Sequence, residues 1–271
     1  MRRFGVAAIL VAMVQSASAA DLPILRGSYT EPSFRSSRNW EGFYVGGQAG
    51  YGVTDSDFTN STKDLTAKML ANTTIENQFS ISSWPLMSSA SNHNKAFGGF
   101  VGYNMQWENA VVGVEANYMH GSFGASSSGA MSRSLVASDG YTYGVTSAST
   151  GSMMLNDFGS VRVRGGYVWG DALPYAFVGV GLGRGTFNQT SHVYGVAVNS
   201  SAQPGFTNIP FDYFATDNKN NRLLFGYSVG VGLDYMLLGG LFVRAEWEYT
   251  QFQAPVDTIV NTVRGGVGYK F

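Results

Sequence analysis

The feature that most constrains this chain is a strict alternation of apolar side chains with glycine, polar or ionised ones. It is clearest in 223–237, where odd positions carry Leu, Phe, Tyr and Val, and even positions carry mainly Gly, Ser and Asp. A helix would mix the two sets on every face, whereas a strand sends successive side chains to opposite sides. The alternation therefore predicts β-strands with one apolar face and one small or charged face.

Eight alternating segments of about 11 to 15 residues follow one another, long enough to cross a bilayer at a tilt. They are 40–52, 97–107, 110–120, 155–169, 173–183, 223–237, 241–251 and 259–271. Segment 173–183 is apolar on both faces, so its facing stays unassigned.

The connections between these segments alternate in length. Tight turns lie at 108–109, 170–172 and 238–240, while 52–95, 121–154 and 184–222 are long and rich in Ser, Thr, Asn and Gly, and 252–257 is shorter. Short turns on one side and long loops on the other are typical of outer-membrane barrels. We therefore expect an all-β, eight-stranded antiparallel transmembrane barrel with long extracellular loops and short periplasmic turns.

Composition disfavours the other classes of protein. A soluble sandwich would have to bury the charged faces or expose the aromatic ones. No segment after the N-terminal region offers 18 continuous apolar residues for a membrane helix, although only 13% of the residues are charged. The absence of cysteine excludes disulfides, and 17 basic against 18 acidic residues argue against a nucleic-acid partner.

The N-terminus has the layout of a secretory signal peptide. Arg2 and Arg3 precede an apolar stretch at 4–14 and a small-residue cleavage site at 17–19. The expected domains are a signal peptide at 1–19, an irregular periplasmic leader at 20–39 and the barrel at 40–271, placed in the cell outer membrane.

Aromatic residues at the strand ends predict two bands at the lipid–water interfaces. The periplasmic band is Phe43, Trp107, Trp169, Tyr235, Tyr269 and Phe271, and the outer band is Tyr51, Phe97, Tyr118, Phe225, Trp247 and Tyr249.

Ionised side chains on the inward faces form the main candidate site. They are Glu115, Arg162, Arg164, Asp234, Arg244, Glu246, Glu248, Arg264 and Lys270. An eight-stranded barrel is only wide enough for its own side chains, and an unpaired ion away from water costs several kcal/mol. A salt-bridged plug is the favoured interpretation, and a polar thread that conducts small ions is the alternative.

Several motifs carry a family resemblance. The chain resembles the alphaproteobacterial small outer-membrane β-barrel proteins, a porin-like family of surface antigens. The similar segments are 19–23, 39–47, 50–52, 102–104, 161–167 and 263–271. Within the last, Val263, Val267, Tyr269 and the terminal Phe271 resemble the signal by which the barrel assembly machinery recognises its substrates.

The resemblance implies a structural and surface role that supports envelope integrity. Expected partners are outer-membrane lipid, lipopolysaccharide, the barrel assembly machinery, and a host or small-molecule ligand at the outer loops. Some members of the family bind haemin. The only histidines, His93, His120 and His192, are the candidates for such binding, and all three fall in or beside the outer loops, a location that suits capture at the surface.

We expect no enzymatic activity, catalytic residue, cofactor or metal, because nothing in the spacing of the residues enforces a catalytic arrangement. The alternatives to a structural and surface role are a narrow diffusion channel and a surface protein that binds haem or another ligand.

Overall fold

The computed structural model describes residues 38–199, 208–253 and 256–271. The predicted signal peptide and most of the predicted leader lie outside the described residues. All described residues belong to one compact unit, Arg35–Phe271.

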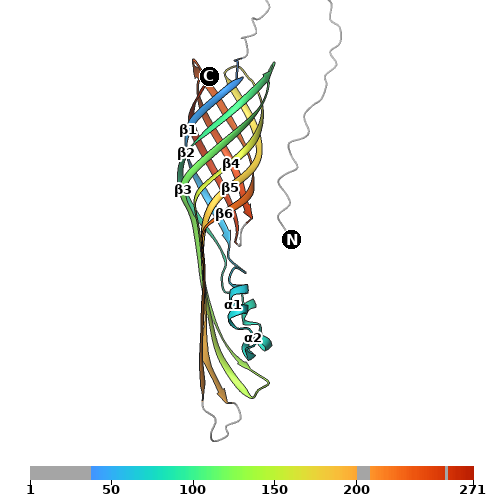
Figure 1. The fold of residues 1–271 in the computed structure, drawn as a ribbon, viewed down its shortest axis with the longest axis vertical. Coiled ribbons are helices and arrows are strands. Elements are labelled where there is room, and N and C mark those ends of the chain that lie inside the picture. Colours follow the sequence, from blue (N-terminus) through green and yellow to red (C-terminus); the bar gives the residue numbers. More distant parts are fainter. Residues whose placement is uncertain (1–37, 200–207, 254–255) are drawn as a thin grey trace, which may run out of the picture. The chain divides into compact units, whose positions relative to one another are not determined.

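Eight antiparallel strands close into a barrel in the order of the sequence, with β1 paired to β8 (Figure 1). The strands are β1 (Gly42–Asp57), β2 (Ser89–Trp107), β3 (Ala110–Val136), β4 (Tyr141–Tyr167), β5 (Ala172–Asn199), β6 (Ile209–Leu238), β7 (Leu241–Gln253) and β8 (Asp257–Lys270). The predicted fold class is confirmed.

Side-chain facing follows the alternation read from the sequence. On β6, Val231 and Leu233 are exposed on the outer wall, while Ser228 and Asp234 are buried inside. The strand left unassigned is β5, and its Tyr175 lies inside, as do Leu173 and Phe177. Both faces of β5 are apolar because its inward residues fill the interior and its outward residues, such as Val178 and Val180, meet lipid.

The short turns are built for tight reversal. Between β6 and β7, Gly239 and Gly240 have φ angles of +54° and +93°, the positive values that a two-residue hairpin requires and that glycine adopts freely. Glu108, between β2 and β3, takes a φ of +53° at the corresponding place.

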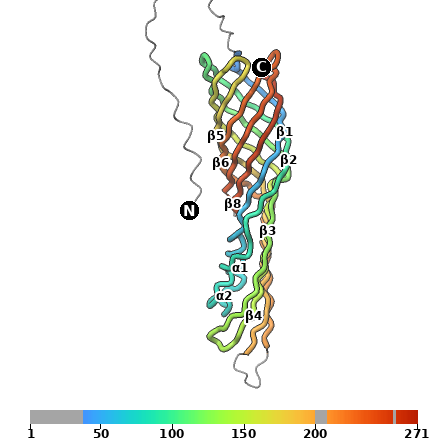
Figure 2. The backbone as a smooth tube through the Cα atoms, turned by 180° about the vertical axis from the view of Figure 1, so that it is seen from behind, coloured from blue at the N-terminus to red at the C-terminus, as the bar shows by residue number. Residues whose placement is uncertain are grey.

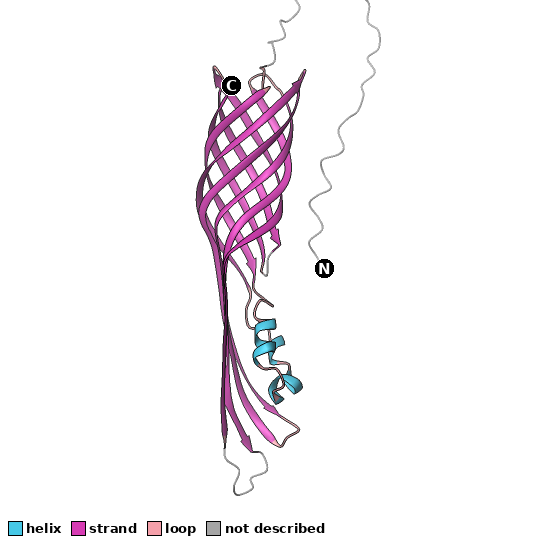
Figure 3. Cartoon of the chain, viewed as in Figure 1, coloured by secondary structure: helices cyan, strands magenta, loops and turns pink. Residues whose placement is uncertain are grey.

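Two of the connections predicted as long loops are extensions of the barrel strands. Predicted loops 121–154 and 184–222 are largely strand, because β3, β4, β5 and β6 continue for 27 to 30 residues each. Past the barrel they stay paired as a four-stranded sheet (Figure 3). We call it the outer sheet; it comprises 123–136, 141–155, 185–199 and 209–222.

The barrel and the outer sheet meet at a level marked by β-bulges. Pairing shifts between His120 and Phe123 on β3 and between Leu155 and Asp157 on β4. On β6 the shift includes Asn221, whose φ is +52°. Bulges bend a strand and increase its twist, and at this level β2 stops pairing with β3 and β7 stops pairing with β6.

The β1–β2 connection folds onto one face of the outer sheet (Figure 2). It contains α1 (Lys63–Met69), α2 (Thr74–Phe79) and the short η1 (Ile81–Ser83). Leu70, Ile75 and Ile81 are buried against Val145 and Val193 of the sheet. Within the described ranges, no helix is long and apolar enough to cross a membrane.

Candidate functional site: the barrel interior and its outer wall

Glu115 on β3 is a central member of a buried charge network. Its carboxylate accepts hydrogen bonds from Arg162 and from Arg244, the latter at 2.9 and 3.0 Å. The Tyr44 hydroxyl donates to the same carboxylate at 2.7 Å, and Arg164 Nη1 lies 3.5 Å from it. One carboxylate therefore ties together strands β1, β3, β4 and β7.

Asp234 on β6 joins two of the same arginines, Arg164 and Arg244. Arg244 donates to its two oxygens from Nε and Nη2 at 2.8 and 3.0 Å, a bidentate pairing. Arg164 Nη1 donates to Asp234 at 2.9 Å, and its Nε donates to Asn104 at 3.1 Å.

Glu246 and Glu248 on β7 complete the network. Arg162 donates to Glu246 from both terminal nitrogens, and the Tyr175 hydroxyl donates to Glu246 at 2.8 Å. Arg264 pairs with both Glu246 and Glu248.

The network is balanced in charge and closed to solvent. None of its members is more than 4% exposed. They are four arginines and four carboxylates, namely Arg162, Arg164, Arg244, Arg264, Glu115, Asp234, Glu246 and Glu248. Buried ions at this depth are tolerated when they are paired and hydrogen-bonded. All eight are ion-paired here, and Arg264 Nη1 also donates to Asn117 Oδ1 at 3.3 Å, whereas Arg264 Nε has no hydrogen-bond partner among the described residues.

Lys270 is the predicted member that the structure places elsewhere. Its Nζ donates to the Glu41 carbonyl at 2.8 Å, at an exposed position. Lys270 lies on the inward side of the alternation, but it is the last residue of β8. Its side chain therefore lies at the mouth of the barrel and not in the interior.

Aromatic rings cover the guanidinium groups. Arg162 lies 3.9 Å from the ring centroid of Phe177, and Arg244 lies 3.9 Å from that of Phe100. Such contacts favour a cation over a ring face. Tyr44 and Asn104 share the inward parity visible in the sequence, but Phe177 lies in the strand whose two faces look alike, so no sequence signal identified it.

Two apolar layers flank the charges. Trp40, Tyr44, Phe100, Leu173 and Phe242 belong to a buried cluster at the short-turn end. A second cluster fills the interior at the level of the bulges and includes Phe58, Met119, Phe123, Phe187 and Phe252. The polar interior is thus enclosed along the barrel axis as well as around it.

Glycines inside the barrel leave room for these side chains. A Cβ on Gly230 would lie 2.2 Å from the Trp247 carbonyl oxygen and 2.3 Å from Phe177 Cζ. At Gly232 the Tyr175 ring occupies the space where a Cβ would lie. Because these inward glycines have no side chains, neighbouring aromatic groups can occupy the space beside them.

The three histidines lie apart from the interior. His120 Nδ1 is 2.8 Å from an Asp157 oxygen, and His192 Nε2 is 2.8 Å from an Asp212 oxygen. His93 stacks on Tyr51. No two of them form a common site, and the described residues contain no group of three or more acidic or histidine side chains able to hold a metal.

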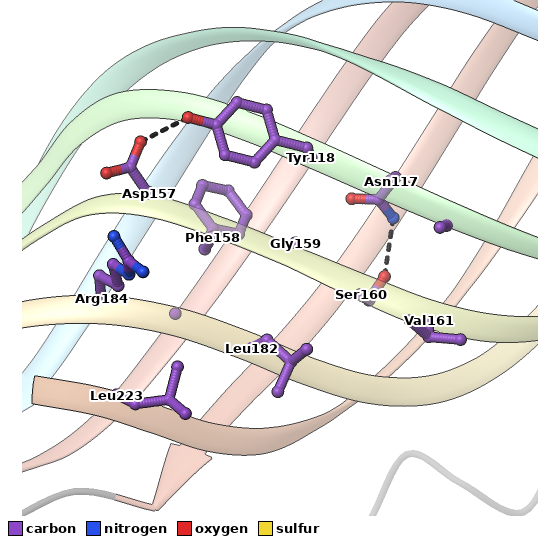
Figure 4. A pocket seen from close by; sticks show the side chains of 12 residues that line it. Asn117, Tyr118, Asp157, Phe158, Gly159, Ser160, Val161, Leu182, Arg184 and Leu223 are labelled. Carbon is purple, nitrogen blue, oxygen red and sulfur yellow. Dashed lines mark hydrogen bonds between the residues drawn. The ribbon is translucent and has the colours of Figure 1, made fainter.

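The outer wall carries a hollow of about 350 Å³ across β3, β4 and β5 (Figure 4). We call it the wall hollow. Gly159 lies between its register neighbours Tyr118 and Leu182, and because Gly159 has no side chain the wall is recessed there. Asp157 and Arg184 line its end nearest the outer sheet.

The predicted assembly-signal residues all lie on the outer wall of β8 or just past it. Val263, Val267, Tyr269 and Phe271 are exposed, and Phe271 N donates to the Phe43 carbonyl at 2.9 Å. The last residues thus help to close the ring against β1.

Comparison with known proteins gives a family model and two curated relatives. The model for the outer membrane protein β-barrel domain matches residues 4–271. A 25 kDa outer-membrane immunogenic protein of Brucella ovis is 24% identical over 174 residues, which is 64% of this chain and 62% of that protein. A 22 kDa outer membrane protein of Rhizobium leguminosarum bv. viciae is 24% identical over 253 residues, 89% of this chain and 82% of that protein.

Solved structures give weaker matches. Ail of Yersinia pestis, in complex with the heparin analogue sucrose octasulfate, is 14% identical with a TM-score of 0.35, covering 85% of this chain and 99% of Ail. Neisserial surface protein A is 12% identical with a TM-score of 0.34, covering 85% of this chain and 97% of that one.

Proposed function

Because this chain belongs to the outer membrane protein β-barrel domain family and resides in the outer membrane, we propose that its barrel is a sealed anchor for the outer sheet. Its role is structural and surface-directed. The proposal adds that the interior carries no solute and that interaction with other molecules takes place on the sheet and the outer wall.

The observation that carries the proposal is the enclosed charge network. Four arginines and four carboxylates neutralise one another between two apolar layers. An ion crossing this interior would have to displace a paired guanidinium or carboxylate, and breaking a buried pair costs about 3–5 kcal/mol. A narrow diffusion channel is therefore the less favoured reading.

The outer sheet supports the surface role. Long outward segments are where outer-membrane barrels vary and where recognition tends to lie. We propose outer-membrane lipid and lipopolysaccharide as partners of the wall, and a host or small-molecule ligand as partner of the sheet. We also propose that the barrel assembly machinery reads Val263, Val267, Tyr269 and Phe271.

The relatives are named as outer membrane or immunogenic proteins. We propose that this chain likewise has no enzymatic activity. His120 pairs with Asp157 on the lipid-facing wall and not with a serine, so it forms no nucleophile–base arrangement. Haem binding gains no support from the structure, because the histidines do not converge.

Conductance in a planar bilayer tests the sealed anchor. Refolded protein, shown to be folded by its heat-dependent gel mobility, should give no discrete current steps while a general porin in the same bilayer does. Reproducible steps whose ion selectivity changes in Glu246→Gln would overturn the proposal.

A further inference from the structure

The outer wall around the wall hollow has an apolar part and a polar part in a fixed order. Toward the middle of the barrel the wall is Ala116 and Val161, followed by the level of Tyr118, Gly159 and Leu182. The next level toward the outer sheet holds His120, Asp157 and Arg184, which are register neighbours on β3, β4 and β5.

The charged level leaves one cation available to a ligand. Asp157 is already engaged, because Tyr118 Oη donates to it at 2.6 Å and His120 Nδ1 lies 2.8 Å from it. Arg184 lies beside Asp157 (Figure 4), yet it makes no ion pair within 4.0 Å among the described residues. A guanidinium with free donors at the edge of an apolar hollow suits a phosphate, which it can bind in bidentate fashion.

The order of these features matches an amphipathic molecule standing in the outer leaflet. Acyl chains would lie over Gly159 toward Val161, and the phosphate would lie at Arg184, at the level where the barrel meets the outer sheet. Tyr118 is exposed on the outer wall and belongs to the predicted outer aromatic band, where rings are expected to meet the headgroup region.

Beyond this level the same face of the wall becomes hydroxyl-rich. The face of the outer sheet opposite the helices carries cross-strand rows of small polar side chains. Two consecutive rows are Ser126, Ser152, Asn188 and Asn218, and then Ser128, Thr150, Thr190 and Thr216. These rows offer donors and acceptors, and no charge, to whatever stands above the lipid.

Aromatic rings follow the polar rows on that face. The His192 ring lies 4.6 Å from Tyr194 and 5.9 Å from Phe214, measured between centroids. Flat rings beside rows of hydroxyl and amide groups form a surface for a saccharide, whose ring faces are apolar and whose edges are hydroxylated.

We propose that this continuous strip binds one phosphorylated glycolipid of the outer leaflet, with its acyl chain in the wall hollow, its phosphate on Arg184 and its saccharide on the polar rows. The inference rests on the proposed function, because it takes the outer sheet to stand at the cell surface. It specifies where and how the wall would hold lipopolysaccharide, and it assigns Arg184 as the residue that selects the phosphate.

The test is lipid binding to the folded barrel in detergent, measured by native mass spectrometry. The probes are lipopolysaccharide with a core oligosaccharide, the same lipid after removal of its phosphates, and phosphatidylglycerol. We expect Arg184→Gln to weaken binding of the intact lipid by about tenfold, the loss of one charge-assisted contact. The matched control is Lys95→Gln, an exposed cation on β2 outside the wall hollow, which should change binding less than twofold.

A second pair of variants tests the hollow itself. Leu182→Trp should fill it and weaken binding, whereas Val178→Trp, at an exposed outward position on the same strand, should not. Dephosphorylated lipid and phosphatidylglycerol should both bind more weakly than the intact lipid. Equal losses in Arg184→Gln and Lys95→Gln, or equal binding of all three probes, would overturn the assignment.

The same preparations are tested for conductance. A silent barrel that fails to bind lipid selectively overturns only this inference. A conducting barrel that binds it as expected overturns only the sealed anchor.

Discussion

At the scale of single residues, Glu115 shows how the buried charges are paired. It contacts three arginines and a tyrosine hydroxyl, so each buried guanidinium near it has a negative partner. Such a network is sensitive to the loss of one member, because the remaining charges stay buried.

We therefore expect Glu115→Gln to lower the free energy of unfolding by about 3–5 kcal/mol, because it leaves Arg162 and Arg244 undercompensated. The measurement is urea unfolding of the lipid-refolded protein, followed by tryptophan fluorescence.

Asp171→Asn is the matched control for that experiment. It makes the same change from carboxylate to amide in an exposed ion pair with Arg38, whose atoms lie 2.6 Å apart, and should cost about 1 kcal/mol or less. Equal losses in the two variants would show that the interior is hydrated.

At the scale of secondary-structure elements, the outer sheet is the part that sequence reasoning missed. In 141–155 small residues such as Ser147 and Ser149 face the helices while Thr146 and Thr150 face outward, so both faces look alike in the sequence. At the bulges on β4 and β6, odd and even positions exchange faces with respect to the barrel. The alternation therefore does not continue from the barrel into the outer sheet, and the sequence pattern is lost at that point.

Barrel strands were predictable for the opposite reason. Arg162 alternates with Val161 and Val163, and in lipid such a pattern has only one stable facing. The same parity indicated Glu115 and Glu246, but it could not show where a strand leaves the interior, and so it misplaced Lys270.

We expect Leu70→Ala to release the helical segment from the outer sheet without opening the barrel. Leu70 is fully buried against the sheet, and truncating such a side chain costs about 2–5 kcal/mol of stability. Because the helical segment is a small unit that can unfold locally, this loss should destabilise that segment and not the barrel. Thermolysin should cut within 58–87 faster than in the unmodified protein, while the heat-dependent gel shift stays. Val136→Ala, at a position 71% exposed, is the control, and equal cutting of the two variants would contradict the packing.

At the scale of the whole molecule, we assign different roles to the two parts: the barrel anchors the chain in the membrane, and the outer sheet interacts with other molecules. The lipid-facing wall keeps the described part of the chain in the membrane, and we propose that its paired interior keeps the barrel closed. β3, β4, β5 and β6 each run as one strand from the barrel into the outer sheet. The sheet is therefore held by paired strands, whose ladders are interrupted only at the bulges, and not by flexible linkers.

The most direct test of the sealed interior uses the absence of cysteine from this chain. Ser228→Cys places a thiol inside the barrel, at a fully buried position between the two apolar layers, and Ser126→Cys places one on the exposed face of the outer sheet. In folded protein, a charged, membrane-impermeant thiol reagent should label the second at once and the first only after unfolding. Labelling of Ser228→Cys in the folded barrel at a comparable rate would mean that water and ions pass through the interior, and the account of a sealed anchor would fail.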